Sequence, residues 1–273
     1  MVRTLDEQAL TDDVEFALQL VALATEIARP FFESGVAAES KADGTPVTIA
    51  DLTVERELIQ ALRHERPDDA ILSEEAGPSG RSNRRWLIDP IDGTEMFVTG
   101  DASWGTHLAL EVDGDIVLGV MSRPVLRQRW WAARGRGAHR CGETGASSGV
   151  VLQVSDVADL SGSQVSVWAE GPSLVAEHLA SLTRLVEPAY DDYIDVIEGR
   201  LEALIFPHPG IAFAWDHAPS VILISEAGGH FRDPEGGTRI DTGRGVFTNG
   251  MVDAELDAAI SWHLTDEHDH DGD

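Results

Sequence analysis

Cysteine and lysine are almost absent from this chain of 273 residues, which contains one of each, Cys141 and Lys41. A single cysteine excludes an internal disulfide and favours a reducing compartment. No apolar run reaches the roughly 18–20 residues that a membrane-spanning helix needs. The acidic stretch "MVRTLDEQALTDDVEFALQL" also lacks the pattern of a signal peptide. We therefore expect a cytoplasmic protein without a membrane segment.

Positive charge is scarce as well, because 20 Lys and Arg stand against 48 Asp and Glu, which gives a net charge of −28. Such a field repels DNA, RNA and anionic lipid, so we expect no nucleic-acid or membrane partner. Most of these acids are expected to form a solvated surface. An anionic substrate would need a local reversal of the field, and a bound cation supplies one.

The last residues, 263–273, carry the acidic stretch "DEHDHDGD". His268 and His270 raise the alternative of a metal site there. Because the stretch has no apolar residue to bury, we expect a disordered tail instead.

Apolar periodicity predicts an amphipathic helix from Leu5 to about Phe32, ended by Pro30 and the Ser-Gly pair that follows. A second helix is expected from about Leu52 to Arg63. The stretch 106–125 reads as strands with a hairpin at "DGD", and "DHAPSVILISEAGG" reads as a later helix that ends at two glycines. Mixed elements in this order predict α/β layers.

The Gly/Ser-rich residues 142–149 are the best candidate for a boundary between halves. We expect an N-terminal α+β half over 1–145 that carries most of the acids discussed below. A C-terminal α/β half is expected over 146–262, followed by the tail.

Acidic residues recur where apolar runs end: after "AIL", after "RWLI" and after "FAW". Acids are almost never fully buried unless they are paired or bind a metal. One such residue is explained by a helix cap or a surface loop, but several beside glycines indicate a site. The acids concerned are Glu74, Glu75, Asp89, Asp92 and Asp216.

The stretch "DPIDGT" suggests the chemistry of this site. Pro90, between the two aspartates, removes a backbone donor, so that the Ile91 carbonyl can turn outward as an oxygen ligand. Carboxylates with a carbonyl form an all-oxygen site that suits Mg²⁺ better than zinc. Gly93 and Thr94 offer amides at a probable helix start, where anions bind. A cation beside an anion site is typical of a metal-dependent phosphatase.

A competing motif is the Asp-x-Asp-Gly-Thr nucleophile signature of haloacid-dehalogenase-type phosphatases. In this chain two residues separate Asp89 from Asp92, and the motif lies almost ninety residues into the chain. That family carries its motif near the N-terminus with one residue between the aspartates, so this alternative is disfavoured.

The stretch "DPIDGTEMF" resembles the first signature of the inositol monophosphatase family, Asp-Pro-x-Asp-Gly-Thr-x-Asn-Phe. "WDHAPSVILISEAGG" is similar to its second signature, and "KADGTPVTIAD" and "SEEAG" match two further segments in the expected order. Met96 stands where the family has Asn, but none of the expected ligands is lost.

The resemblance implies a layered α/β/α/β/α sandwich, often a homodimer, that hydrolyses small phosphate monoesters by metal-activated water with two or three Mg²⁺ ions. It assigns the first ion to Glu74, Asp89 and the Ile91 carbonyl. The second ion would be held by Asp89, Asp92 and Asp216.

The resemblance also assigns the groups that act on water and phosphate. Asp51 and Thr94 would orient and deprotonate the attacking water, and the Gly93 and Thr94 amides would hold the phosphate.

Substrate specificity is less defined by the sequence. Inositol-selective members have an acid seven positions before the second-signature aspartate, and this chain has Pro209 there. "GDIVLGVMSRPVLRQRWWAARGRGA" looks more like the histidinol-phosphatase branch, and Asp191 or Asp192 could pair with the ammonium of histidinol phosphate. Inositol monophosphate and adenosine 3′,5′-bisphosphate follow as alternatives. The non-enzyme alternative is a catalytically silent regulatory homologue. The presence of every expected metal ligand argues against it.

Three further residue types have simpler interpretations. Trp130 and Trp131 are expected to pack in a sheet or an interface. His217 follows a predicted ligand and is expected beside the site or on the surface. Lys41 could steer an anionic substrate.

Overall fold

The computed structural model describes residues 6–42, 44–143, 149–169 and 171–260. The chain forms two compact units, unit 1 over Met1–Val151 and unit 2 over Leu152–Asp273. Among the described residues, no helix combines the length and the apolar character that crossing a bilayer would require. The expected boundary after residue 145 and the expected tail both fall on residues outside the described ranges, and they remain predictions.

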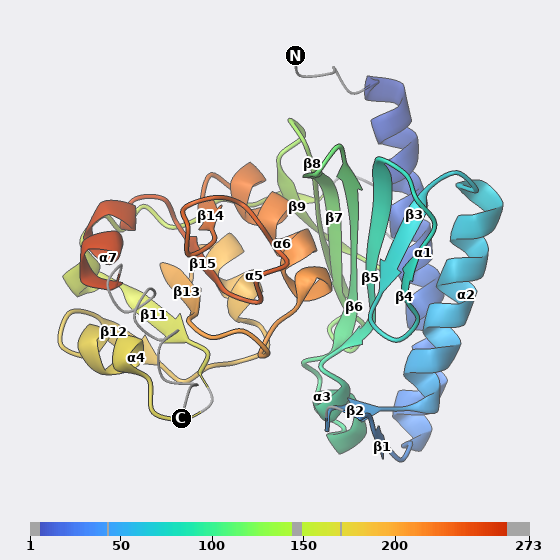
Figure 1. Cartoon of the computed structure of the whole chain (residues 1–273), viewed down its shortest axis with the longest axis horizontal. Helices are drawn as coiled ribbons and strands as arrows, with labels where there is room; N and C mark the ends of the chain where they lie inside the picture. The colour runs from blue at the N-terminus through green and yellow to red at the C-terminus, as the bar shows by residue number, and fades with distance from the viewer. Residues whose placement is uncertain (1–5, 43, 144–148, 170, 261–273) are drawn as a thin grey trace. The chain divides into compact units, whose positions relative to one another are not determined.

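Unit 1 is built on an eight-stranded sheet with the strand order β10-β9-β8-β7-β6-β5-β3-β4 (Figure 1). Neighbouring strands run antiparallel except for the parallel pair β3 and β5. The predicted hairpin is confirmed at residues 113–114 between β6 and β7. The strands are β3 (Ala70–Ser73), β4 (Gly77–Ser79), β5 (Arg84–Asp92), β6 (Gly105–Val112), β7 (Asp115–Arg123), β8 (Gln128–Ala133), β9 (Ala138–Gly142) and β10 (Val150–Val151).

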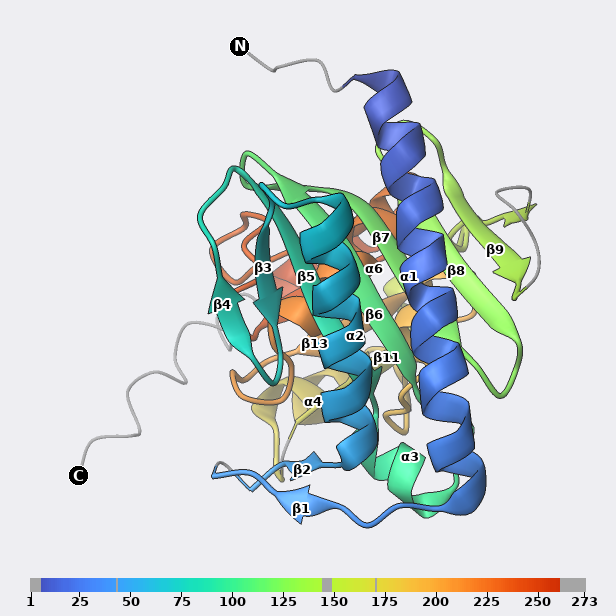
Figure 2. The ribbon, with the colours of Figure 1, turned by 90° about the vertical axis from the view of Figure 1, so that its right-hand side faces the viewer.

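Two long helices, α1 (Glu7–Ser34) and α2 (Ile49–Glu65), cover one face of this sheet (Figure 2). Their apolar residues recur at helical spacing and join strand residues in one core. Trp86 on β5 is completely buried there, and Trp131 on β8 packs in the same cluster, which confirms its predicted packing role. The remaining elements of unit 1 are β1 (Glu39–Ser40), β2 (Pro46–Val47) and α3 (Thr94–Thr99).

The predicted first helix is confirmed by α1, which continues through Pro30 to Ser34. Proline lacks an amide hydrogen and frees the carbonyl of the residue four positions earlier, here Glu26. Both residues are exposed, so water can satisfy that carbonyl and the helix can continue. Gly35, at φ 72°, caps the helix, so the Ser-Gly pair ends it as predicted and Pro30 alone does not.

Unit 2 contains a five-stranded sheet with the order β12-β11-β13-β15-β14. Ala203 and Ile205 on β13 pack in a core with α4 and α7, whereas Phe206 contacts the rings of Tyr193 on α5 and His217 on α6. Alternation along β13 therefore places two helices on each face (Figure 1). The elements are η1 (Leu160–Gly162), β11 (Gln164–Val167), α4 (Leu174–Leu179), β12 (Arg184–Val186), α5 (Asp192–Ile197), β13 (Ala203–Phe206), α6 (Ala214–Glu226), β14 (His230–Arg232), β15 (Gly245–Thr248) and α7 (Asp253–Ile260).

The core of unit 1 can be tested with two leucines on the same helix. Leu58 is completely buried between α2 and the sheet, whereas Leu52 is 48% exposed. We expect Leu58→Ala to lower the free energy of unfolding by about 2–5 kcal/mol, because it removes buried contacts and leaves a cavity. Leu52→Ala should cost less than about 1 kcal/mol. Urea unfolding of both variants measures the difference, and equal costs would contradict this packing.

Candidate functional site

Strand β5 ends in the two aspartates of the "DPIDGT" stretch. Its register with β6 shifts between Asp89, which pairs with His107, and Asp92, which pairs with Gly105. This irregularity lets both acids leave the strand on the same side, because strict alternation would direct residues three apart to opposite faces. Asp89 and Asp92 each offer a carboxylate oxygen, and these two oxygens lie within 4.8 Å of one another.

A sharp turn follows the strand and leads into α3. Gly93 adopts a left-handed conformation with φ 78° and ψ 45°, which glycine tolerates best, and its carbonyl accepts from the Phe97 amide at 2.9 Å. Thr94 is the first residue of α3, and its hydroxyl lies 3.1 Å from the Ile91 carbonyl oxygen. The turn thus brings the Thr94 side chain back beside the predicted carbonyl ligand.

Asp51 and Thr94, 43 residues apart in the sequence, are brought into contact. Asp51 lies in the first turn of α2, where its Oδ2 accepts from the Thr48 amide at 2.8 Å and from the Thr48 hydroxyl at 2.6 Å. This reciprocal cap starts the helix and fixes the carboxylate. The other oxygen, Oδ1, lies 3.2 Å from the Thr94 hydroxyl. Burial raises the pKa of Asp51, against the opposing effect of these hydrogen bonds.

Glu74 follows β3, and its amide donates to the Ile88 carbonyl on β5 at 3.1 Å. Its carboxylate is paired with Lys41, whose Nζ lies 2.7 Å from Glu74 and 2.5 Å from Glu75. Burial opposes the charge of Lys41, but the two glutamates outweigh it and raise the pKa of Lys41. Lys41 is therefore held against a predicted metal ligand, and its role in steering substrate remains a prediction.

Glu55 is a further buried acid beside the candidate site, which the sequence analysis did not identify. It is buried on α2, and its Oε1 accepts from the Glu75 and Ala76 amides at 3.0 and 3.1 Å and from the Ser73 hydroxyl. These bonds hold the turn that carries Glu74. Burial raises the pKa of Glu55. The available signal was an acid within the predicted apolar face of a helix, beside Val54 and Leu58.

Asp216 lies on unit 2, in the first turn of α6, where its Oδ2 accepts from the Phe213 amide at 2.7 Å. The next residue, His217, is completely buried in that unit, so the surface alternative for it is wrong. Its Nδ1 lies 2.8 Å from the Tyr193 hydroxyl. Burial lowers the pKa of His217 to about 3, which makes the imidazole neutral at pH 7.

Asp192 does not have the environment expected of a substrate contact. It is 3% exposed, and its Oδ2 accepts from the Ser166 hydroxyl at 2.5 Å, from the Trp168 indole at 2.9 Å and from the Ala189 amide at 3.0 Å. These bonds hold the start of α5 against β11. Asp191, the residue before it, is only half-buried and is the better placed of the two for a ligand.

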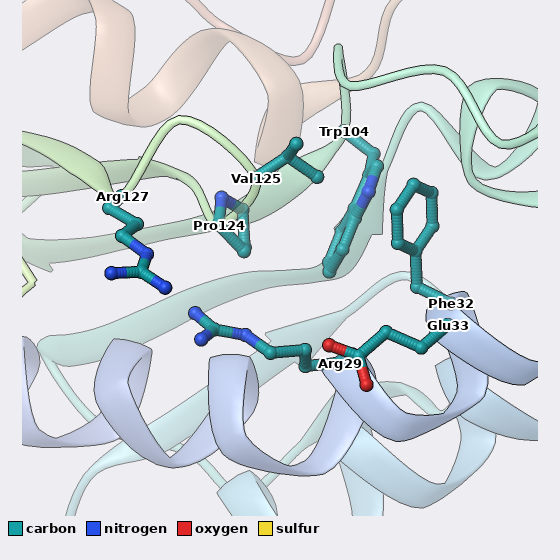
Figure 3. A pocket seen from close by; sticks show the side chains of 7 residues that line it. All are labelled: Arg29, Phe32, Glu33, Trp104, Pro124, Val125 and Arg127. Atoms are coloured by element: carbon teal, nitrogen blue, oxygen red, sulfur yellow. The ribbon is translucent and has the colours of Figure 1, made fainter.

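Unit 1 also has a hollow of about 190 Å³ (Figure 3). It contains none of the predicted ligands, and the Arg29 guanidinium at its edge is paired with Glu143. Because none of the predicted metal ligands lines it, we do not assign the phosphate to this hollow. Its lining residues are Arg29, Phe32, Glu33, Trp104, Pro124, Val125 and Arg127.

The role of Glu55 can be tested in the presence of EDTA, where bound metal cannot contribute. We expect Glu55→Ala to lower the free energy of unfolding by about 1–3 kcal/mol, because the buried Ser73 hydroxyl and two backbone amides lose their acceptor. Glu57→Ala, on the exposed side of the same helix, should change it by less than about 0.5 kcal/mol. Chemical unfolding measures both, and a neutral Glu55→Ala would show that the turn is held by other contacts.

The chain is similar to several known proteins. A model of the inositol monophosphatase family matches residues 9–266. A Streptomyces griseus protein named glucose-1-phosphate thymidylyltransferase is 41% identical over 233 residues, which are 84% of this chain and 88% of that protein. A histidinol-phosphatase of Mycobacterium tuberculosis is 38% identical over 257 residues, which are 90% of this chain and 96% of that protein.

Solved structures give the same result at the level of the fold. An IMPase of Thermotoga maritima matches with a TM-score of 0.80 and 26% sequence identity, covering 94% of this chain and 99% of that one. The predicted α/β fold of the inositol monophosphatase type is thereby confirmed. By its sequence and by its fold, the chain belongs to the inositol monophosphatase family.

Proposed function

We propose that this phosphatase hydrolyses a small phosphate monoester with Mg²⁺, and that histidinol phosphate is its preferred substrate. The observation that carries the proposal is the contact between Asp51 and Thr94 beside the acids at the end of β5. A hydroxyl held by a carboxylate next to a cation site is the arrangement needed to activate water.

The donor set fits Mg²⁺. Every predicted ligand atom is a carboxylate or carbonyl oxygen, the type that this ion prefers. We propose two or three ions, held by the carboxylates and the Ile91 carbonyl. When bound, Mg²⁺ lowers the pKa of water and neutralises the charge of the phosphate and of the leaving oxygen. The proposed ligands are Glu74, Asp89, Ile91, Asp92 and, from unit 2, Asp216.

In this mechanism the chain's own groups orient the water and accept its proton. The Thr94 hydroxyl lies 3.2 Å from Asp51 Oδ1 and 3.1 Å from the Ile91 carbonyl oxygen. A water beside Thr94 can pass its proton to the hydroxyl oxygen while the threonine proton moves to Asp51. The raised pKa of Asp51 suits this acceptor role. The Gly93 and Thr94 amides are proposed to hold the phosphate, and water attacks phosphorus directly, without a covalent intermediate.

The preference for histidinol phosphate is supported by the histidinol-phosphatase of M. tuberculosis, which matches 90% of this chain. Asp191 is the proposed partner of the substrate ammonium, since Asp192 is engaged within unit 2. Inositol monophosphate and then adenosine 3′,5′-bisphosphate are the alternative substrates. The name of the S. griseus relative denotes nucleotidyl transfer to glucose 1-phosphate, which is a separate activity to test.

The setting of this activity also belongs to the proposal. A small phosphorylated metabolite is the partner, the compartment is the cytoplasm, and the protein acts as a homodimer. A catalytically silent regulatory homologue is the alternative that the experiments below would expose.

Phosphate release from a panel of esters tests the substrate. The panel contains histidinol phosphate, inositol 1-phosphate and adenosine 3′,5′-bisphosphate, each with Mg²⁺ and with EDTA, and glucose 1-phosphate with dTTP for nucleotidyl transfer. We expect Mg²⁺-dependent release with the highest kcat/KM on histidinol phosphate, and no release by Asp89→Asn. A faster reaction with another ester would reassign the substrate, and inactivity on all of them would favour the silent homologue.

Thr94 can be tested without disturbing its amide. We expect Thr94→Val to lower kcat about a hundredfold or more with little change in KM, because proton transfer loses its hydroxyl while the backbone contact to phosphate remains. Thr99→Val is the matched control, since this hydroxyl lies on the same helix and bonds only to helix carbonyls. Steady-state kinetics measure both variants, and equal kcat values would make Thr94 a structural residue.

A further inference from the structure

Two basic side chains that the sequence analysis did not single out lie against Asp92. The Arg123 guanidinium lies with its Nη1 3.2 Å from Asp92 Oδ2, and His107 Nε2 lies 3.3 Å from the same oxygen. Arg123 and His107 are completely buried, whereas the Asp92 side chain is 15% exposed. The predicted metal ligand Asp92 is therefore already paired with a cation of the chain, the Arg123 guanidinium.

The sheet is built to let this arginine reach the end of β5. Arg123 ends β7, and β6 lies between β7 and β5. On β6 the residue that pairs with Asp92 is Gly105. A Cβ at Gly105 would lie 1.7 Å from the Ser122 carbonyl oxygen and 3.0 Å from Arg123 Nη1. Only glycine therefore permits the approach of Ser122 and Arg123 over this strand.

The charge on this arginine is permanent, because a guanidinium does not lose its proton in a protein. Burying it without a carboxylate would be very unfavourable, and Asp92 provides that carboxylate. The same contact has a consequence for metal binding. Arg123 offsets part of the negative charge of Asp92 and repels a divalent ion that approaches its other oxygen.

We propose that Arg123 is a positioning residue that holds Asp92 by one oxygen and weakens the ion position that depends on this carboxylate. The inference rests on the metal site of the proposed function. In this proposal Arg123 supplies, beside Asp92, part of the positive charge that a second ion would otherwise supply. The second ion then binds weakly to the free protein and more tightly once a phosphate dianion adds its negative charge.

A Mn²⁺ titration of the full chain without substrate, followed by electron paramagnetic resonance, tests this proposal. Free Mn²⁺ gives the signal, so the method yields both the number of bound ions and their affinities. We expect Arg123→Met to tighten one Mn²⁺ by about tenfold or more, because it removes a positive charge beside the ion. Arg123→Lys, which keeps the charge, should bind Mn²⁺ as the unchanged protein does.

Asp92→Asn identifies the position that responds. Combined with Arg123→Met, it should abolish the tightening, because the carboxylate that Arg123 screens is no longer there. Addition of inorganic phosphate should tighten the weak Mn²⁺ of the unchanged protein more than that of Arg123→Met. Thermal unfolding in EDTA verifies that each variant is folded. If Arg123→Met does not fold, Arg123→Gln replaces it.

The outcomes separate this inference from the proposed function. Equal or weaker Mn²⁺ binding by the neutral variant would overturn the role of Arg123 and leave the metal site standing. Tightening that persists when Asp92→Asn is added would do the same. If neither the unchanged protein nor any variant binds Mn²⁺, the metal site itself fails, and the inference fails with it. The inference is supported if Arg123→Met tightens Mn²⁺ binding, Arg123→Lys does not, and the tightening is lost when Asp92→Asn is added.

Discussion

The concentration of carboxylates at the end of β5 is the constraint on which the rest of unit 1 depends. Acids with so little exposure destabilise a fold unless each has a compensating group. Asp51 has the Thr48 cap and Thr94, Glu74 has Lys41, and Asp92 has Arg123. The chain thus balances the charge of this site with its own donors and cations, and the balance leaves oxygens that a metal ion can use.

Backbone geometry matters as much as charge in this arrangement. The irregular register between Asp89 and Asp92 directs both acids to one side of the sheet, and the left-handed turn at Gly93 brings Thr94 back beside Ile91. Gly105 has the complementary role, since the absence of its side chain makes room for Arg123. Helices α1 and α2 pack against the sheet in a continuous apolar core, and this packing keeps the acids in position.

Much of the fold could be predicted, because periodicity and turn chemistry are local. The helix near residue 52, the hairpin at 113–114 and the helix that contains Asp216 follow from apolar spacing and glycine placement. Pro30 was misread because its effect on a helix depends on exposure, which the sequence does not give. The environment of Asp192 could not be predicted for the same reason, since its three hydrogen-bond donors come from β11, from Trp168 and from the segment before α5.

The sequence by itself determined the chemical groups of the candidate site, because "DPIDGT" places two carboxylates, a backbone carbonyl and a helix start within six residues. It also determined the family, through motifs that occur in order. Only the tertiary structure decided which distant groups meet these acids. Asp51 reaches Thr94 through the packing of α2, and Arg123 reaches Asp92 across β6. Such contacts depend on strand order and on the closeness of backbones, and no local pattern in the chain encodes either.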